Sequence, residues 1–167
     1  MRRLLITGVA ILTGLFFFGC QSSVRYTSDH RTKEANPVYK DYSNLSDVRQ
    51  TVLTEAERWL GTPYCFGGET KDCIDCSAFI CKIYEGAGVK LPRTSTEQFS
   101  YCKKINPSEK QPGDIVFFKK GKNINHVGIY AGSNQFIHSS SSQGVVRQSL
   151  NDDYFRTKIA GYGRVLN

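Results

Sequence analysis

The sequence predicts an α+β domain in which helices of the first half pack on an antiparallel sheet of the second half. Two features of the chain indicate this class. Apolar residues recur at helical spacing at residues 46–60 and 76–85, whereas short apolar runs divided by turn residues follow residue 112. Helices that are followed by consecutive strands are typical of α+β folds. The 167 residues suffice for one domain of ordinary size and an additional N-terminal segment.

Three helices are expected before the sheet. The first is amphipathic and spans residues 46–60. The second spans residues 76–85, because Asp75 is a good N-cap and an apolar helical pattern follows it. The third is shorter; it is capped within the Thr94-Ser95 pair and reaches about Cys102.

Five strands are expected at residues 115–118, 126–131, 135–139, 145–149 and 160–166. A hairpin turn joins the second and third of these strands. If its three-residue loop is centred on Gly132, Val127 faces Ile137. The same register places His126 opposite His138, on the other face of the sheet from this apolar pair.

A glycine-rich stretch leads into Asp75-Cys76-Ser77 at the start of the second expected helix. In a first helical turn, unpaired backbone N–H groups and the helix dipole favour a thiolate over a thiol. We therefore interpret Cys76 as a nucleophile, with a structural or disulfide-bonded cysteine as the alternative. Two histidines on one sheet face, in a chain with 3 histidines, suggest that His126 is a base and His138 its orienting partner.

Several further motifs surround these residues in a fixed order. They are GTPYCFGG at 61–68, DCSAF at 75–79, LPRTS at 91–95, PGDIVFF at 112–118, HVGIY at 126–130 and FIH at 136–138. With this order and spacing, the chain resembles the NlpC family of cell-wall cysteine peptidases over roughly residues 46–166. One departure is Ala78, where the family usually has glycine.

The resemblance implies a papain-like fold and a peptidase that cleaves the peptide stems of peptidoglycan, commonly between γ-D-glutamate and a diamino acid. His126 would take the proton of Cys76, and His138 would hold the second ring nitrogen of His126, in a reaction through a thioacyl-enzyme. Tyr64 would point into the active site and form an oxyanion hole with the backbone N–H of Cys76. No cofactor or metal is implied. The implied substrate-binding residues are Asp75, Ser77, Arg93 and Ser95.

Three other classes of function remain open at this point. An acyl or thioester transferase of similar fold could use the same cysteine and histidines. A catalytically silent, wall-binding lipoprotein is the second alternative. A thiol-disulfide oxidoreductase or zinc site could use the Cys73-Ile74-Asp75-Cys76 run, but no second Cys-x-x-Cys motif or close histidine pair completes a zinc set.

Residues 1–20 are typical of a lipoprotein signal peptide. Arg2 and Arg3 precede an apolar run from Leu4 to Phe18, and Gly19-Cys20 follows, where cleavage would leave Cys20 to be acylated. A secretory signal or an uncleaved anchor is the alternative, and each version places the domain outside the cytoplasm. We expect the bacterial cell envelope, with the outer membrane favoured. Residues 21–44 are polar and read as a flexible tether, and residues 45–167 form the peptidase domain.

Six cysteines are present in this exported chain. With Cys20 assigned to lipid and Cys76 to chemistry, the remaining four are Cys65, Cys73, Cys81 and Cys102. Four cysteines allow three pairings, and the sequence does not choose among them. A Cys65–Cys73 bond would clip the loop before the nucleophile, and Cys81–Cys102 would then tie two helices together. A reversible Cys73–Cys76 bond that silences the nucleophile is a further hypothesis.

The formal net charge of the chain is +7. Such moderate basicity suits proximity to an anionic wall or lipid headgroups without specifying either. No nucleic-acid motif and no lysine or arginine stripe with interleaved aromatic residues occurs, so a nucleic-acid partner is not expected. The expected partners are peptidoglycan stem peptides and a membrane reached through the lipid, and the expected state is a monomer.

Overall fold

The computed structural model describes residues 46–165. The expected signal peptide at 1–20, its Cys20 and the tether at 21–44 lie outside the described residues. The helices are α1 (Asp47–Arg58), α2 (Cys76–Glu85), α3 (Ser95–Tyr101), the 3-10 helix η1 (Pro107–Glu109) and α4 (Asp153–Arg156). The strands are β1 (Lys103–Ile105), β2 (Ile115–Lys120), β3 (Asn123–Gly132), β4 (Gln135–Ser140), β5 (Gly144–Ser149) and β6 (Ile159–Arg164). Within this range, no helix is both long and apolar enough to cross a membrane.

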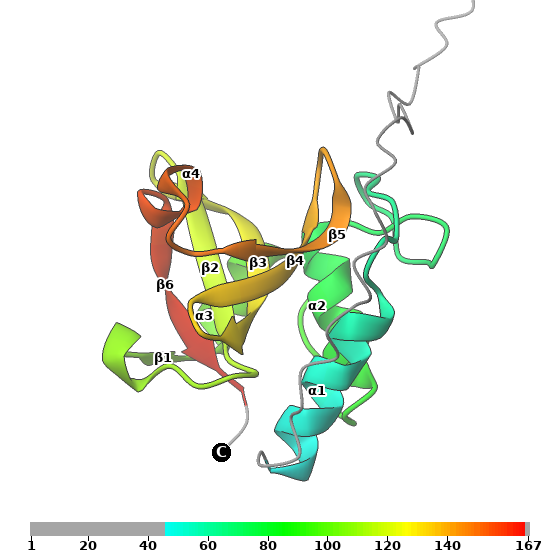
Figure 1. Cartoon of the computed structure of the whole chain (residues 1–167), viewed down its shortest axis with the longest axis horizontal. Coiled ribbons are helices and arrows are strands. Elements are labelled where there is room, and N and C mark those ends of the chain that lie inside the picture. The colour runs from blue at the N-terminus through cyan, green and yellow to red at the C-terminus, as the bar shows by residue number, and fades with distance from the viewer. Residues whose placement is uncertain (1–45, 166–167) are drawn as a thin grey trace, which may run out of the picture. The chain divides into compact units, whose positions relative to one another are not determined.

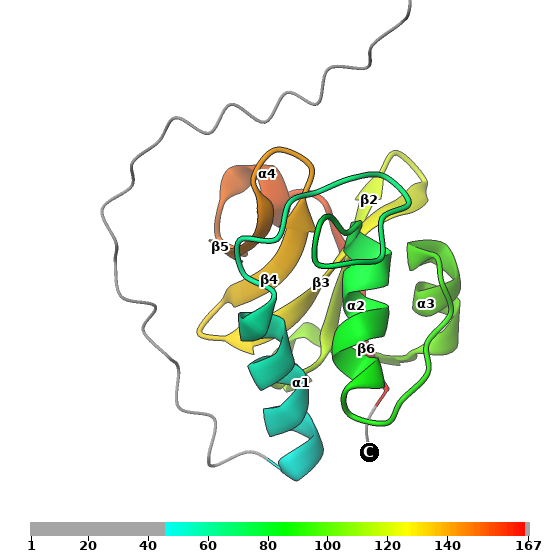
Figure 2. The same ribbon diagram turned by 90° about the vertical axis from the view of Figure 1, so that its right-hand side faces the viewer.

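The six strands form one antiparallel sheet in the order β1-β6-β2-β3-β4-β5 (Figure 1). Helices α1, α2 and α3 lie on one face of this sheet, which Figure 2 shows with the helices toward the viewer. This arrangement confirms the α+β class. β1, η1 and α4 were not expected from the sequence, because each spans only three or four residues and has no apolar period of its own.

Local signals in the sequence determine where the helices begin. The Asp75 side chain accepts a hydrogen bond from the Ala78 backbone N–H, which caps α2. Thr94 and Glu97 form a reciprocal capping box at the start of α3. α2 therefore has the predicted bounds, and Cys76 is its first residue.

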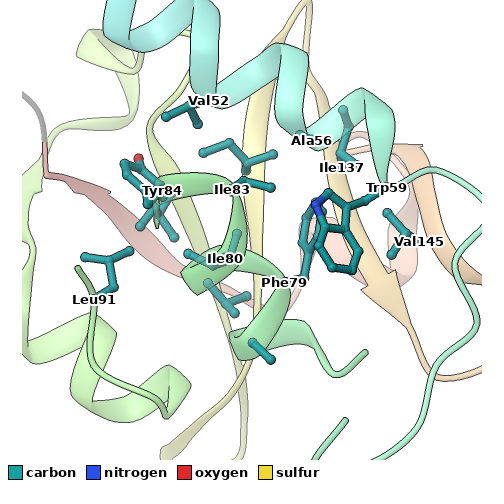
Figure 3. Packing of buried hydrophobic residues seen from close by; sticks show 14 of the residues in the cluster. Val52, Ala56, Trp59, Phe79, Ile80, Ile83, Tyr84, Leu91, Ile137 and Val145 are labelled. Atoms are coloured by element: carbon teal, nitrogen blue, oxygen red, sulfur yellow. The ribbon is translucent and has the colours of Figure 1, made fainter. Parts of the chain in front are cut away.

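The sheet is buried on both faces. Helices α1 and α2 contribute Val52, Phe79, Ile83 and Tyr84 to the larger core, and Trp59 joins them directly after α1 (Figure 3). The opposite face carries a second cluster, made up of Val116, Phe118, Tyr130, Phe136, Leu150, Phe155 and Tyr162. Burial on both faces explains why β2 begins with four consecutive buried apolar residues instead of an alternating pattern.

The predicted register of the β3–β4 hairpin is wrong. Ile137 pairs with Ile129 instead of Val127, because Ser133 and Asn134 close the turn in the left-handed conformation (φ 52° and 53°). A register shift between Tyr130 and Gly132 accompanies the turn. The displacement is two residues, so the side-chain alternation is preserved and both histidines still lie on one face.

A disulfide joins Cys65 to Cys73 and closes the loop that precedes α2. Cys76, Cys81 and Cys102 are free. The sequence had left the pairing open, and the structure contains a Cys65–Cys73 bond without a bond between Cys81 and Cys102. Cys73 is bonded to Cys65, so the structure does not contain the hypothesised Cys73–Cys76 bond.

Candidate active site

One cavity of about 480 Å³ brings together the three residues predicted to carry the chemistry. Cys76 from the start of α2, His126 from β3 and His138 from β4 all line it. Its remaining lining residues are Tyr64, Asn125, Ser140, Ser141, Ser142, Gln148, Asp152, Tyr154 and Phe155. The Cys76 thiol and the imidazole pair therefore face the same space, although they are 50 residues or more apart in sequence.

The environment of Cys76 favours the neutral thiol. Burial, with a smaller contribution from the nearby Asp75 carboxylate, raises the pKa of Cys76 to about 11. The backbone N–H groups of Val127, Ser77 and Cys76 itself lower this pKa but do not outweigh burial. The expectation that the helix start favours a resting thiolate is therefore wrong, because desolvation exceeds the stabilisation supplied by these amides.

The two histidines form a short relay with a glutamine. His126 Nε2 lies 2.7 Å from His138 Nδ1, and His138 Nε2 lies 2.5 Å from Gln148 Oε1. Burial, with a smaller contribution from His138, lowers the pKa of His126 to about 3. Burial also lowers the pKa of His138 to about 4, against the opposing effect of its hydrogen bond to the Gln148 amide oxygen. Both rings are therefore neutral in the resting site at pH 7.

Aromatic rings of the second core hold the histidines in place. The Phe136 ring stacks on His138 with 4.5 Å between centroids, and Phe155 meets His138 edge-on at 5.3 Å. Gly128 leaves the space that His138 occupies, since a Cβ at this position would lie 2.7 Å from Phe136 Cδ2 and 3.0 Å from His138 Cβ. A glycine is therefore required at this position of β3, next to His138 on β4.

Tyr64 is half-buried at the edge of the cavity. Burial raises the pKa of Tyr64, with smaller electrostatic contributions from Cys76 and Asp75, so its hydroxyl stays protonated and can donate. The loop that carries it is held at both ends. The Ile74 N–H donates to Pro63 O at 2.9 Å, and the Asp75 N–H donates to Gly68 O at 3.1 Å.

The four predicted substrate-binding residues do not line this cavity. Arg93 donates to the Asp75 carboxylate at 2.6 and 3.1 Å and to Ser77 Oγ at 3.0 Å. The Arg93 pairing lowers the pKa of Asp75 against the effect of burial, so Asp75 is ionised. Ser95 is the first residue of α3. Three of the four thus form one cluster beside the nucleophile, and their role with substrate stays a prediction.

Gln148 was missed by the sequence reasoning. It lies on β5 opposite Phe136, so it neighbours His138 diagonally across the strand pair. Only the β4–β5 register could have indicated this contact, and no local motif marks it. Among residues 46–165, no group of three or more histidine, cysteine, aspartate or glutamate side chains is arranged to hold a metal ion.

The family model of the NlpC/P60 family matches residues 61–164 of this chain. The chain belongs to this family. Murein DD-endopeptidase MepS/Murein LD-carboxypeptidase of Escherichia coli K12 is 39% identical over 122 residues, which cover 72% of this chain and 65% of MepS. Probable endopeptidase NlpC of the same strain is 37% identical over 152 residues, covering 87% of this chain and 90% of NlpC. The chain thus spans just under two thirds of the length of MepS.

A solved NlpC/P60 structure has the same fold. The crystal structure of a lipoprotein-like NLP/P60 family protein from Staphylococcus aureus Mu50 superposes with a TM-score of 0.67 at 32% identity. The match covers 77% of this chain and 45% of the Staphylococcus chain. The papain-like architecture and the NlpC resemblance are therefore confirmed.

Proposed function

We propose that this NlpC/P60 chain is a cysteine endopeptidase that hydrolyses the stem peptides of peptidoglycan. Cys76 is the nucleophile, His126 the general base and His138 its orienting partner. One observation carries the proposal: the thiol at the first turn of α2 and the hydrogen-bonded imidazole pair line the same cavity. The substrate class is supported by the family and by the name of MepS, a murein endopeptidase.

The first step starts from neutral groups. As the Cys76 sulfur attacks the carbonyl carbon of the scissile bond, its proton passes to His126, which becomes an imidazolium. A buried imidazolium is costly without a nearby negative charge, as the lowered pKa of His126 indicates. Proton transfer is therefore coupled to attack, when the charge that develops on the carbonyl oxygen compensates for it.

The negative charge on the carbonyl oxygen is stabilised by donors at the start of α2. The backbone N–H of Cys76 and the protonated hydroxyl of Tyr64 form the oxyanion hole. When the tetrahedral intermediate collapses, the C–N bond breaks and His126 gives its proton to the leaving amine. A thioester on Cys76 remains. Water then loses a proton to His126, attacks the thioester carbon and releases the acid, and the sulfur regains the proton.

The bond that we assign is the one between γ-D-glutamate and the diamino acid, in line with the family resemblance. Asp75, Ser77, Arg93 and Ser95 are proposed to bind the part of the stem next to Cys76. Within the cluster, Asp75 is 7% exposed, whereas 38% of the Arg93 side chain is exposed. Arg93 is thus the member with most surface to offer a substrate carboxylate, while Asp75 holds Arg93 in place.

The site of action is proposed to be the cell envelope, outside the cytoplasm. The Cys65–Cys73 disulfide supports an oxidising compartment. Attachment of lipid at Cys20, retention at the outer membrane and a monomeric state complete this proposal. Mass spectrometry of the intact mature protein tests the anchor, since acylation adds the mass of the lipid to a chain that begins at Cys20.

The decisive experiment incubates the purified protein with uncross-linked stem monomers and with cross-linked dimers, and weighs the products. Cleavage at γ-D-glutamate shortens the monomers, whereas cleavage of the cross-link alone leaves monomers intact and splits dimers. Cys76→Ala and His126→Ala are expected to abolish cleavage, and Cys81→Ala, which removes a free thiol outside this cavity, is expected to retain it. Cleavage by Cys76→Ala would refute the proposal. An added amine that captures the acyl group in place of water would indicate the transferase alternative.

A further inference from the structure

We propose that Gln148 is a positioning residue that fixes the tautomers of both histidines and so leaves a lone pair on His126 for the Cys76 proton. This inference rests on the proposed function, because it concerns the same proton transfer. It extends the Cys76–His126–His138 set by one residue from β5. Gln148 acts through His138 and does not itself exchange a proton.

The strand geometry places Gln148 at the end of the relay. Gln148 pairs with Phe136 across β4 and β5, and His138 pairs with Val146. Gln148 and His138 therefore lie diagonally on one face of the sheet, within reach of a long side chain. The 2.5 Å contact between His138 Nε2 and Gln148 Oε1 requires a proton on that nitrogen, since the amide oxygen only accepts.

This proton determines the rest of the chain of bonds. A neutral imidazole carries one N–H, so His138 with a proton on Nε2 has a lone pair on Nδ1. That lone pair accepts from His126 Nε2, 2.7 Å away. His126 is then also protonated on Nε2, and its Nδ1 is the free acceptor. The amide oxygen of Gln148 thereby selects which nitrogen of His126 serves as the base.

The reversed amide gives the opposite result. If the Gln148 NH2 group faced His138 Nε2, the proton of His138 would lie on Nδ1 and would be donated to His126 Nε2. His126 would then carry its proton on Nδ1 and could not accept one from Cys76. Of the two amide orientations, only the one with Oε1 toward His138 yields an active base.

The surroundings favour a side chain over solvent in this role. His138 is 1% exposed, and the Phe136 and Phe155 rings cover it. Water in bulk would both donate to and accept from the ring and would allow both tautomers. A single, partly buried amide oxygen that only accepts removes this freedom.

The test compares two variants. Gln148→Met keeps the length of the side chain but has no oxygen to accept the hydrogen bond from His138, whereas Gln148→Glu keeps such an oxygen. The matched control is Gln143→Met, an exposed glutamine in the β4–β5 turn that does not line the cavity. We expect Gln148→Met to lower kcat for stem cleavage by about 10- to 100-fold with little change in KM. Gln148→Glu should retain more activity than Gln148→Met and shift the acidic limb of the pH profile upward, because a carboxylate stabilises the imidazolium form.

The second readout is independent of activity. The chain has 3 histidines, so 15N imidazole NMR of the full protein resolves each ring, with His30→Gln used for assignment. The wild type should show His126 and His138 both protonated at Nε2, and Gln148→Met should show mixed tautomers. A wild-type His138 protonated at Nδ1 would overturn the inference, as would unchanged kcat and tautomers in a folded Gln148→Met. If Gln148→Met does not fold, the inference is still tested by the tautomers of the wild type and by the pH profile of Gln148→Glu. If the wild type shows the predicted tautomers but cleaves no stem peptide, the proposed function is refuted and the inference about Gln148 is not.

Discussion

Replacing Gly128 by alanine should damage catalysis far more than its single added methyl group suggests. The new Cβ would lie 2.7 Å from Phe136 Cδ2 and 3.0 Å from His138 Cβ, and 3.0 Å from the Ile137 backbone oxygen. None of these atoms is the free end of a flexible side chain, because Phe136 is fully buried and His138 is 1% exposed. The β3–β4 pair must therefore separate, or both rings must tilt.

The cost in stability follows from overpacking. Inserting a methyl group into a packed core costs about 1–3 kcal/mol, and the reduced chain entropy of alanine offsets about 0.4–1 kcal/mol of it. We expect a net loss of about 1–2 kcal/mol in the free energy of unfolding. The effect on kcat should be larger, about 100-fold, because the added group pushes His138 directly and a misplacement of about 1 Å at the reacting groups has this effect.

Urea denaturation followed by circular dichroism measures the first effect, and stem cleavage under saturating substrate measures the second. The matched control is Gly86→Ala at the end of α2, where the new Cβ meets the Glu55 side chain at 3.0 Å and the Ile83 backbone oxygen at an ordinary contact distance of 3.5 Å. This variant should keep both its kcat and, within about 0.5 kcal/mol, its free energy of unfolding. A Gly128→Ala protein with wild-type kcat would show that the His126–His138 geometry tolerates this displacement, and the reasoning would fail.

Three other predictions concern stability. The folded-state pKa values of His126 and His138 lie below the ordinary value of histidine, so below pH 6.5 the unfolded chain binds more protons than the folded one. The free energy of unfolding should therefore fall as the pH drops from about 6.5 to about 4. The slope should reach up to about 2.7 kcal/mol per pH unit, since two histidines contribute. Urea midpoints over this range test it, and His138→Gln should reduce the slope. Joint replacement of Cys65 and Cys73 by serine should lower the free energy of unfolding by about 2–3 kcal/mol, the value for a disulfide loop of this length. Equal urea midpoints for the variant and the oxidised wild type would contradict this prediction. Asp114→Ala should cost about 3–5 kcal/mol in the same assay, because it leaves two arginines without their buried carboxylate; a loss under 1 kcal/mol would refute this.

Local signals in the sequence were sufficient for the helices α1, α2 and α3 and for the position of Cys76 at the start of α2. The bounds of α2 followed from Asp75 as N-cap and from the apolar pattern after it, and the position of Cys76 followed from both. The pairing of His126 with His138 was predicted on a register that the structure corrects. The prediction of a shared face survived because the error was two residues, which leaves the alternation of side chains unchanged.

Properties that depend on tertiary packing could not be predicted in the same way. The pKa of Cys76 rises because the completed domain buries it, whereas the helix dipole that argued for a thiolate is a local feature. The contact between Gln148 and His138 depends on how β5 aligns with β4, which no residue near Gln148 specifies. The short elements likewise have partners distant in sequence: β1 pairs with β6, and Phe155 of α4 packs in the second core with residues of β2 and β4.

The second core has a practical consequence for anyone who wishes to make this protein more heat-resistant. Phe136 and Phe155 belong both to the apolar cluster on that side of the sheet and to the wall around the imidazoles. A tighter fit among these rings would move the reacting groups along with them. Stabilising substitutions should therefore be sought beneath α1, away from these rings and from Cys76 at the start of α2.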